Sequence, residues 1–348
     1  MISYDDLFEI DPFSLSAKEK KLLRDTLLSA LSEHHKEHCQ EYRRLSTVLG
    51  DGFDLPVRLF KEYDLMSISP EDIVKTMTSS GTSGQAVSKI YLDRDTSSRQ
   101  TKALARIVTS VVGKSRPPLL VIDSKSVIKN RAMFSARGAG ILGFSMLGRD
   151  VTYALDENME LDYEEINLFY ERHQNETVML FGFTYMIWQH FCQALQDKKA
   201  HFDLSGVLIH GGGWKKLVDQ SVDNEEFKKT IESTCGISRV HNYYGMVEQT
   251  GSIFMECEAG HLHASVFSDI DFLDPQTLTP SSNKKGIIRS ISFLPTSYPG
   301  HVLLTEDEGA LLGEDDCPCG RKGKYFEVYG RVKGAEIRGC SDTYGDNK

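Results

Sequence analysis

The chain has 348 residues, of which 40% are hydrophobic and 26% charged, and its formal net charge is -10. This composition describes a folded globular protein of one large or two smaller domains, and the acidic excess argues against duplex nucleic acid as a partner. The N-terminus lacks the layout of a signal peptide and no apolar run reaches membrane-spanning length, so we expect a cytoplasmic protein without a transmembrane segment.

The first 71 residues are expected to form a helical region. Ser16 and Glu19 make a capping-box pattern, and leucines follow at helical spacing, which predicts a helix over residues 14–46. Three histidines lie among charged residues in its last part and are expected on a solvated face: His34, His35 and His38.

A run of hydroxyl and glycine residues follows. Glycines let the backbone curl so that successive N–H groups point inward, and Ser and Thr hydroxyls add donors, which predicts a nest for phosphates. A flexible surface loop is the alternative interpretation of such a run. The run comprises Thr78, Ser79, Ser80, Gly81, Thr82, Ser83, Gly84 and Gln85.

From about residue 72 short apolar runs alternate with amphipathic helices such as 185–198. Buried strands are predicted at 119–123, 178–182 and 207–211, and each ends in an acid or a glycine. This alternation predicts an α/β fold with parallel strands and helices on both faces, whose ligands bind at the carboxyl ends of the strands. After residue 260 shorter strands and turns predict a more antiparallel region.

Further polar and glycine positions follow the predicted strands. A glycine triplet after a strand permits close approach of a flat ligand, and the aromatic run before Glu248 would stack a base while that carboxylate holds Mg²⁺. Asp307 would accept hydrogen bonds from ribose hydroxyls, and Arg331 would supply a guanidinium to ribose or phosphate. The glycine and aromatic positions are Gly211, Gly212, Gly213, Tyr243, Tyr244 and Gly245.

Together, and in this order, these segments resemble the adenylate-forming enzymes. The resemblance covers residues 78 to 339 and implies an α/β large domain that binds ATP and Mg²⁺, with Thr78–Gly84 over the phosphates. One departure is Val247, which stands where most members carry a threonine.

Within that superfamily the chain is similar to the acyl-protein synthetases of bacterial luminescence systems, the long-chain-fatty-acid–luciferin-component ligases. The similarity lies in residues 78–100, 134–137, 181–184, 244–249, 319–324 and 336–340. It implies activation of a fatty acid as acyl-AMP and transfer to a protein thiol, with an acyl-reductase or another acceptor protein as partner. Cys340 is the position that resembles the acyl-accepting cysteine.

The end of the sequence departs from most adenylate-forming enzymes, which continue into a lid of about a hundred residues with a catalytic lysine. Only 17 residues, 332 to 348, follow Arg331, so we expect a 72–331 core, a 332–348 tail and no full lid. Lys324, Lys333 or a partner protein would then supply the missing charge.

Two thiols one residue apart, Cys317 and Cys319, bind metal more often than they form a disulfide. With Cys257 and one histidine they would complete a tetrahedral Zn²⁺ site. Phenylacetate-ligase-like relatives carry a similar pattern, which favours His263, and His261 remains open on geometry.

The sequence therefore predicts an ATP-dependent, AMP-forming acid–thiol ligase. The catalytic residues are expected to be Glu248, Arg331 and Cys340, while four aromatic residues are candidates to line the acyl site. An acyl- or aryl-CoA ligase and a non-catalytic nucleotide-binding homologue are the alternatives. The aromatic candidates are Phe181, Phe183, Tyr185 and Trp188.

Overall fold

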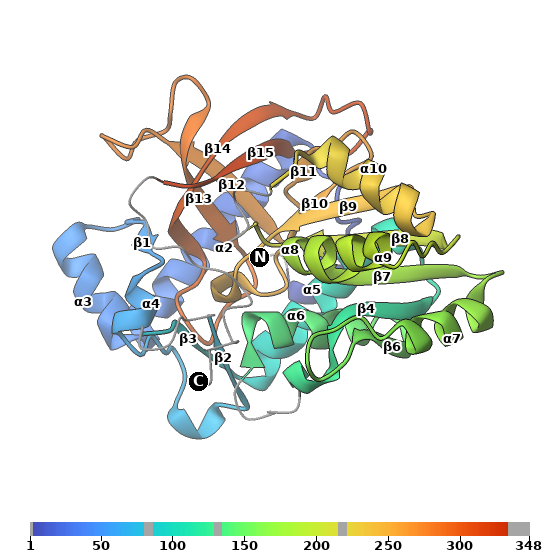
Figure 1. The fold of residues 1–348 in the computed structure, drawn as a ribbon. Helices are drawn as coiled ribbons and strands as arrows, with labels where there is room; N and C mark the ends of the chain where they lie inside the picture. Colours follow the sequence, from blue (N-terminus) through green and yellow to red (C-terminus); the bar gives the residue numbers. More distant parts are fainter. Residues whose placement is uncertain (1–2, 80–85, 129–133, 215–220, 333–348) are drawn as a thin grey trace. The chain divides into compact units, whose positions relative to one another are not determined.

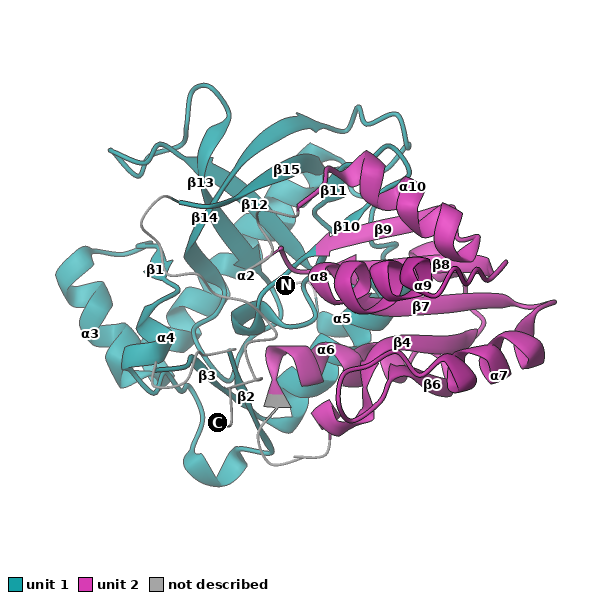
Figure 2. Ribbon diagram, viewed as in Figure 1, with its two compact units in different colours: residues 1–108, 244–338, 342–348 teal, residues 109–243, 339–341 magenta. Residues whose placement is uncertain are grey.

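The structure is a computed structural model that describes residues 3–79, 86–128, 134–214 and 221–332. These residues form two compact units (Figure 2). The first unit comprises the described residues of 1–108 and 244–338, and the second those of 109–243. The three-part division expected from the sequence stays a prediction.

Two long helices, α2 and α5, and several short ones make up most of the first 112 residues (Figure 1). The elements are α1 (Tyr4–Glu9), α2 (Ala17–His38), α3 (Gln40–Leu49), α4 (Leu59–Glu62), η1 (Pro70–Asp72) and α5 (Arg94–Val112).

The helix predicted over residues 14–46 is present, but it is two helices. Ser16 and Glu19 form the expected capping box at the start of α2. The chain leaves the helical conformation at Cys39, which has φ -112° and ψ 112° and is fully buried, and α3 begins at the next residue. The break between the two helices therefore lies at a buried residue in an extended conformation. The sequence has no glycine or proline there that would have predicted the break.

The prediction for His35 is wrong. This side chain is fully buried, with Ser67 Oγ 2.8 Å from Nδ1 and the Pro295 carbonyl oxygen 3.2 Å from Nε2. It continues the buried face of α2 formed by Leu23, Leu27 and Leu31, because residues four apart lie on one side of a helix. His38 is exposed as expected.

The main sheet of the first unit is antiparallel, as predicted for the residues after 260. Its order is β12-β13-β14-β15-β11-β10, and β1 adds to β14 in parallel. A separate antiparallel pair, β2 and β3, flanks the predicted phosphate loop. The strands are β1 (Leu55–Pro56), β2 (Lys75–Thr78), β3 (Lys89–Leu92), β10 (Phe254–Glu256), β11 (Leu262–His263), β12 (Ser268–Leu273), β13 (Lys285–Ser292), β14 (Val302–Glu314) and β15 (Lys324–Arg331).

The second unit has a parallel sheet in the order β6-β4-β7-β8-β9, which confirms the predicted strands and their direction. A π-helical segment lies within the helix predicted at 185–198. The elements are β4 (Pro118–Ser124), η2 (Lys125–Ile128), β5 (Phe134–Ser135), α6 (Ala136–Ser145), β6 (Arg149–Leu155), α7 (Tyr163–His173), β7 (Thr177–Phe183), α8 (Thr184–Met186), η3 (Ile187–Gln193), α9 (Ala194–Asp197), β8 (Ser205–Gly211), α10 (Asn224–Cys235) and β9 (Arg239–Tyr244).

Helices cover both faces of this parallel sheet. On one face Leu180 and Leu208 belong to a buried cluster that includes Phe169 of α7 and Ile231 of α10. On the other face Phe144 of α6 stacks on a β7 ring. At the end of β4, Asp123 and Arg137 form an ion pair that is almost completely buried, with Arg137 Nε 2.6 Å from a carboxylate oxygen.

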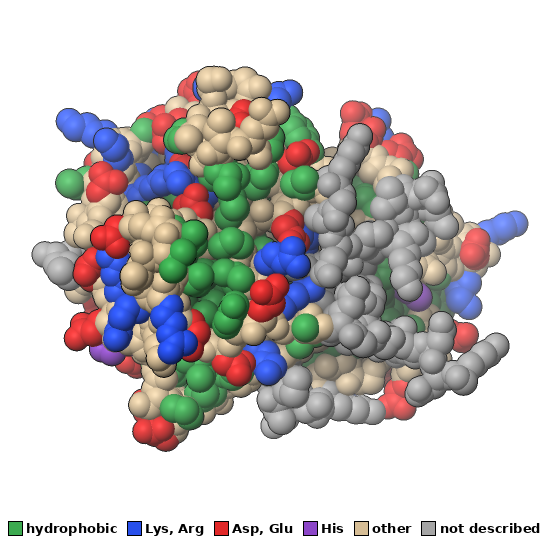
Figure 3. Space-filling view, turned by 90° about the vertical axis from the view of Figure 1, so that its left-hand side faces the viewer, with side chains coloured by type: hydrophobic (Ala, Val, Ile, Leu, Met, Phe, Trp, Pro, Cys, Tyr) green, Lys and Arg blue, Asp and Glu red, His purple; other side chains and the backbone are tan. Residues whose placement is uncertain are grey.

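The surface of the molecule is charged and mixed. Acidic and basic side chains are interspersed on the face drawn in Figure 3, with apolar side chains between them. The net negative charge is therefore not collected into one patch on that face. Within the described residues, no helix has the length and apolar character required to cross a membrane.

Candidate nucleotide and metal sites

The predicted ribose-binding residues lie together in the first unit. Asp307 and Arg331 are directly opposite each other on β14 and β15. The Tyr244 hydroxyl donates to Asp307 Oδ2 over 2.7 Å, and Arg331 Nε lies 3.3 Å from Oδ1. Arg331 also contacts Glu306 at 3.0 Å. Asp307 is therefore held at both carboxylate oxygens, in a fixed orientation.

Two properties of this cluster were not evident from the sequence. The strand β14 continues past Asp307 to Glu314, so the carboxylate lies inside a paired strand and not at its end. Burial, followed by the charge of Asp307, raises the pKa of Tyr244 well above its usual value. The phenol therefore remains a hydrogen-bond donor at neutral pH.

Glu248 lies in the first unit on the short helix η5 (Val247–Gln249). Its exposed fraction is only 4%, and its backbone carbonyl accepts a hydrogen bond of 2.8 Å from the Tyr298 hydroxyl. Val247, which replaces the more common threonine, is buried as well. Glu248 is thus a buried carboxylate four residues after Tyr244, whose hydroxyl binds Asp307.

Only the start of the predicted phosphate loop lies within the described residues. Thr78 ends β2 and is buried. The Ser79 N–H donates to the Ser88 carbonyl over 3.1 Å, and the Ser88 N–H donates to Ser79 Oγ over 2.9 Å. These two bonds close the base of the loop. Residues 80–85 lie outside the described residues, so their part of the prediction stays a prediction.

The glycine triplet of the second unit lies at the end of β8, as predicted. The surroundings and backbone conformation differ among the three glycines. A Cβ at Gly211 would lie 2.5 Å from the Tyr243 ring, so this ring packs directly on the backbone. Gly212 has φ +78°, which favours glycine, and a Cβ on Gly213 would meet open space. The turn therefore has the Tyr243 ring packed on one side and solvent-accessible backbone at Gly213.

Thr184 holds this turn, although the sequence analysis gave it no role. Its hydroxyl lies 2.8 Å from the Gly212 carbonyl oxygen, 3.2 Å from that of Gly211 and 2.9 Å from His210 Nδ1. A hydroxyl directly after an apolar strand was the available signal, because polar groups at the carboxyl end of a parallel strand face the ligand edge of the sheet.

The aromatic residues proposed for the acyl site do not share one surface. Phe181 stacks on Phe144 with ring centroids 3.9 Å apart and contacts Phe183 and Tyr243. Trp188 instead packs with the opposite cluster. Phe181 and Phe183 lie on the face of β7 opposite to Leu180, because side chains alternate along a strand. Trp188 belongs to the helical segment η3, which packs with the cluster that contains Leu180.

The predicted zinc ligands meet in the first unit although they come from three segments. One donor atom each from Cys257, His263, Cys317 and Cys319 lies within 4.8 Å of all the others. Cys319 Sγ is 3.5 Å from His263 Nε2, and the Sγ atoms of Cys257 and Cys317 are 3.9 Å apart. Three thiols and one imidazole are a donor set that suits tetrahedral Zn²⁺.

His261 is close to the same cluster. Its Nδ1 lies 3.3 Å from Cys317 Sγ, and both imidazoles stack on Tyr325. The four donors that lie mutually close nevertheless include His263. Burial, followed by the charge of Arg321, lowers the pKa of His263 to about 3, so its ring is neutral and suited to ligation.

Neighbours of the predicted zinc ligands also contact the N-terminal segment. The Arg321 guanidinium lies 4.5 Å from the centroid of the Phe13 ring, and the Lys322 N–H donates to the Phe13 carbonyl over 2.9 Å. Lys20 donates to the Ala264 carbonyl over 2.8 Å, next to His263. These contacts attach residues 13–20 to the segments 263–264 and 321–322, which adjoin the predicted ligands.

Lys324, which the sequence offered as a substitute for a lid lysine, is part of a partly buried ion network. Its Nζ lies 2.8 Å from Asp271 and 3.3 Å from Asp269. Arg24 contacts both of these carboxylates, and Arg289 lies 2.7 Å from Asp271. Lys324 is therefore a structural cation in this arrangement.

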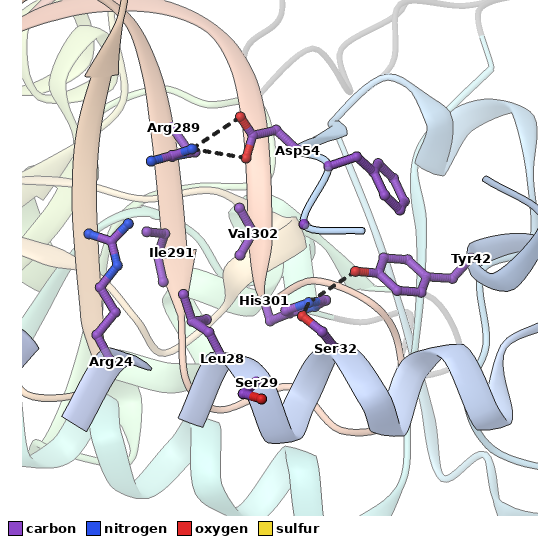
Figure 4. A pocket seen from close by; sticks show the side chains of 12 residues that line it. Arg24, Leu28, Ser29, Ser32, Tyr42, Asp54, Arg289, Ile291, His301 and Val302 are labelled. Atoms are coloured by element: carbon purple, nitrogen blue, oxygen red, sulfur yellow. Dashed lines mark hydrogen bonds and ion pairs between the residues drawn. The ribbon is translucent and has the colours of Figure 1, made fainter. Parts of the chain in front are cut away.

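A cavity of about 190 Å³ lies between α2 and strands β13 and β14 (Figure 4). Its two guanidiniums already have carboxylate partners, since Arg289 contacts Asp54 at 3.3 Å and Arg24 contacts the Asp269 and Asp271 carboxylates. His301 lies in its wall beside Ser32 and Tyr42. Because both arginines of the cavity already pair with carboxylates, the cavity offers no unpaired guanidinium to an anionic ligand.

Over residues 1–347 the chain matches the family described as "Acyl-protein synthetase, LuxE". The chain belongs to this family. It is 27% identical to the long-chain-fatty-acid–luciferin-component ligase of Vibrio harveyi over 97% of this chain and 91% of that protein. The ligase of the same name from Aliivibrio fischeri is 24% identical over 97% of this chain and 92% of that protein.

Solved structures support the fold. An open conformation of 2-hydroxyisobutyryl-CoA ligase, in complex with 2-HIB-AMP and CoA, superimposes with a TM-score of 0.69 at 15% identity, covering 92% of this chain and 77% of that chain. The predicted large-domain fold of adenylate-forming enzymes, the family and the ligase class are thus confirmed. The roles of individual site residues are proposals.

Proposed function

We propose that this chain uses ATP to activate a long-chain fatty acid and then transfers the acyl group to a protein thiol. The fatty carboxylate oxygen attacks the α-phosphorus, a new P–O bond forms, and pyrophosphate leaves with the electrons of the broken bond. A thiolate then attacks the acyl carbon, which forms a thioester and releases AMP. The match to the acyl-protein synthetase family over residues 1–347 carries this proposal.

The first unit supplies the ribose and phosphate contacts. The Asp307 carboxylate, oriented by Tyr244 and Arg331, accepts the ribose hydroxyls. Glu248 is the residue that would hold Mg²⁺, whose chemistry is to neutralise phosphate charge as pyrophosphate leaves. The phosphates are assigned to the run Thr78–Gly84, of which only Thr78 and Ser79 lie within the described residues. Positioning and charge neutralisation suffice for catalysis, because the nucleophile is already an anion.

The residues proposed to contact the base belong to the second unit. The Tyr243 ring and the open backbone at Gly213 offer a flat apolar surface and exposed peptide groups to adenine. Gly211 and Gly212 allow this backbone to turn. Thr184 keeps the turn in place through its contacts with two glycine carbonyls.

The acyl acceptor is Cys340, which lies outside the described residues. An acyl-reductase or another acceptor protein takes the acyl group onward. The cytoplasmic location expected from the sequence stays a prediction.

The cluster of Cys257, His263, Cys317 and Cys319 holds a structural Zn²⁺ ion. Three observations support this role: the donor atoms are mutually close, the thiols are buried or half-buried, and the Arg321 N–H points to Cys319 Sγ over 3.4 Å. An N–H···S contact of this kind stabilises a metal-bound thiolate. No catalytic step involves this ion.

The activity is tested by incubating the purified full chain with ATP, Mg²⁺ and a radiolabelled long-chain fatty acid. We expect acid-stable label on the protein that hydroxylamine removes, and its loss in Cys340→Ser. Ser341→Ala is the matched control, because it changes the adjacent side chain and keeps the thiol. Label that persists in Cys340→Ser would contradict the assignment of the acceptor.

The same experiment separates the alternatives. Label found only as acyl-CoA, after coenzyme A is added, would favour a CoA ligase. Absence of fatty-acid-dependent exchange between pyrophosphate and ATP would favour a non-catalytic nucleotide-binding protein.

The zinc assignment is tested by metal analysis of the chain purified without added metal. We expect one zinc ion per chain and its loss in Cys319→Ser, whereas Cys192→Ser, which changes a buried thiol of the other unit, keeps it. Unchanged zinc content in Cys319→Ser would end the proposal.

A further inference from the structure

The short helix that carries Glu248 is held by a buried loop, residues 293–301, which connects β13 to β14 in the first unit. This 293–301 loop is buried almost throughout, although it contains several polar residues. Buried polar groups are retained at little cost only when they are hydrogen-bonded, so their partners indicate what the loop fixes in place.

Tyr298 is the central residue of the loop. Its side chain is completely buried, and its ring packs edge-on against Phe60 with centroids 6.0 Å apart. The hydroxyl donates to the Glu248 carbonyl over 2.8 Å and accepts from Gln100 Nε2 over 3.1 Å. A single phenol thus links α5 to the backbone of the carboxylate proposed to hold Mg²⁺.

Gly300 brings the loop close to the same carbonyl. A Cβ at this position would lie 2.9 Å from the Glu248 carbonyl oxygen and 2.3 Å from the Tyr298 ring. No larger side chain fits there unless the ring or the backbone shifts. The approach of the two segments therefore depends on a glycine at this position.

Gln249 completes the attachment from the other side of the helix. Its amide nitrogen donates to the carbonyls of Gly300 over 2.9 Å and Ser290 over 3.1 Å, and its amide oxygen accepts from Ser290 Oγ over 2.5 Å. Glu248 and Gln249 are consequently fixed to the loop and to β13 by four hydrogen bonds, all of them buried.

The opposite side of the loop is held by α2, α3 and α5. His35 contacts the Pro295 carbonyl at 3.2 Å, and Thr96 Oγ1 accepts from the Ser297 N–H over 3.2 Å. His301, at the end of the loop, lies 3.1 Å from Ser32 Oγ and 3.3 Å from the Tyr42 hydroxyl (Figure 4). The loop is therefore anchored independently of its contact with Glu248.

We propose that Tyr298 is a positioning residue for Glu248, which sets the place of that carboxylate through its backbone carbonyl. The proposal rests on the proposed function, in which Glu248 holds Mg²⁺. Ligands of a metal need orientation from a second layer of residues, and loss of such a residue typically lowers metal affinity or activity by about 10- to 100-fold. Tyr298 does not touch a reacting atom.

The test measures fatty-acid-dependent exchange between pyrophosphate and ATP as a function of Mg²⁺ concentration. In Tyr298→Phe we expect the half-saturating Mg²⁺ concentration to rise roughly tenfold, with the KM for fatty acid unchanged. A Mg²⁺ dependence equal to that of the wild type would overturn the inference. Gln100→Glu serves as a second variant of almost equal volume, because its carboxylate would take the Tyr298 proton away from the Glu248 carbonyl; it is expected to shift the Mg²⁺ dependence in the same direction.

Tyr42→Phe is the matched control. It removes a hydroxyl that contacts the same loop at His301, on the side away from Glu248, so it is expected to lower the melting temperature without changing the Mg²⁺ dependence. An equal Mg²⁺ shift in Tyr42→Phe would mean that general loosening is responsible and would refute the inference. Absence of exchange in the wild type, or normal exchange in Glu248→Gln, would instead contradict the proposed function.

Discussion

Protonation of His301 is expected to weaken the first unit in mildly acidic solution. The imidazole is 1% exposed, and its close neighbours are His34, His35, Ser32 and Tyr42. Burial, followed by the charge of His34, lowers its pKa to about 3. The ring is therefore neutral in the folded protein at a pH where the unfolded chain, with a pKa of about 6.5, binds a proton.

The sign and size follow from this difference. Because the pKa of His301 is lower in the folded than in the unfolded protein, the neutral imidazole costs no stability above pH of about 6.5. The free energy of unfolding decreases as the pH falls below that value. Between pH of about 6.5 and 5.5 this single histidine lowers the free energy of unfolding by about 1 kcal/mol. His35, whose pKa burial also lowers, adds a loss of the same sign.

The perturbation is His301→Gln, which keeps a polar group near Ser32 and Tyr42 but cannot titrate. Urea unfolding of the full chain at both pH values is expected to show a pH-dependent loss that is smaller by about 1 kcal/mol than in the wild type. His38→Gln, which removes an exposed imidazole from α2, is the control and should match the wild type. Equal pH dependence in His301→Gln and the wild type would refute the reasoning.

Three further variants test other parts of the structure. Asp307→Asn removes the charge at the ribose contact, and the KM for ATP in the exchange assay should rise by about 10- to 100-fold, since hydrogen bonds to charged groups contribute about 1.5–3 kcal/mol; an unchanged KM would contradict the ribose role. Lys324→Met leaves the Asp271 network short of a cation and should lower the free energy of unfolding by about 3 kcal/mol, while exchange per folded molecule stays constant; a large loss of exchange per folded molecule would assign it the role of the lid lysine. Gly211→Ala places a methyl group 2.5 Å from the Tyr243 ring and should raise the KM for ATP while the far-UV circular dichroism spectrum is kept; wild-type kinetics would show that the ring is not part of the base site.

Local sequence patterns predicted the parts of the molecule whose structure depends on short-range chemistry. The apolar runs ending in Asp123 or Gly211 are parallel strands, because a strand buried on both faces reads as a continuous apolar segment. The cluster of Cys257, Cys317 and Cys319 was predicted from the spacing of the last two thiols, while the choice of His263 over His261 came from a family resemblance. The structure brings all four together.

Features that depend on tertiary partners were missed. His35 looked solvated because its sequence neighbours are charged, and its partners, Ser67 and the Pro295 carbonyl, lie far from it in the sequence. Tyr298 carried no local signal, since its two hydrogen-bond partners come from α5 and η5. The separation of Phe181 from Trp188 also depends on tertiary packing, because the β7 ring stacks on Phe144 while Trp188, on the helical segment η3, packs with the cluster on the other face of the sheet.

The pairing of β14 with β15 restricts how the length of this protein can vary. Asp307 and Arg331 face each other only because the residues between the metal-ligand cluster and Arg331 have their present number. Deleting one residue from β15 would turn Arg331 to the opposite face of the sheet, and deleting two would restore the face but displace the guanidinium by about 7 Å. Single-residue insertions or deletions are therefore excluded from this segment unless a bulge absorbs them, whereas the exposed turn at residues 274–284 between β12 and β13 is free to change length.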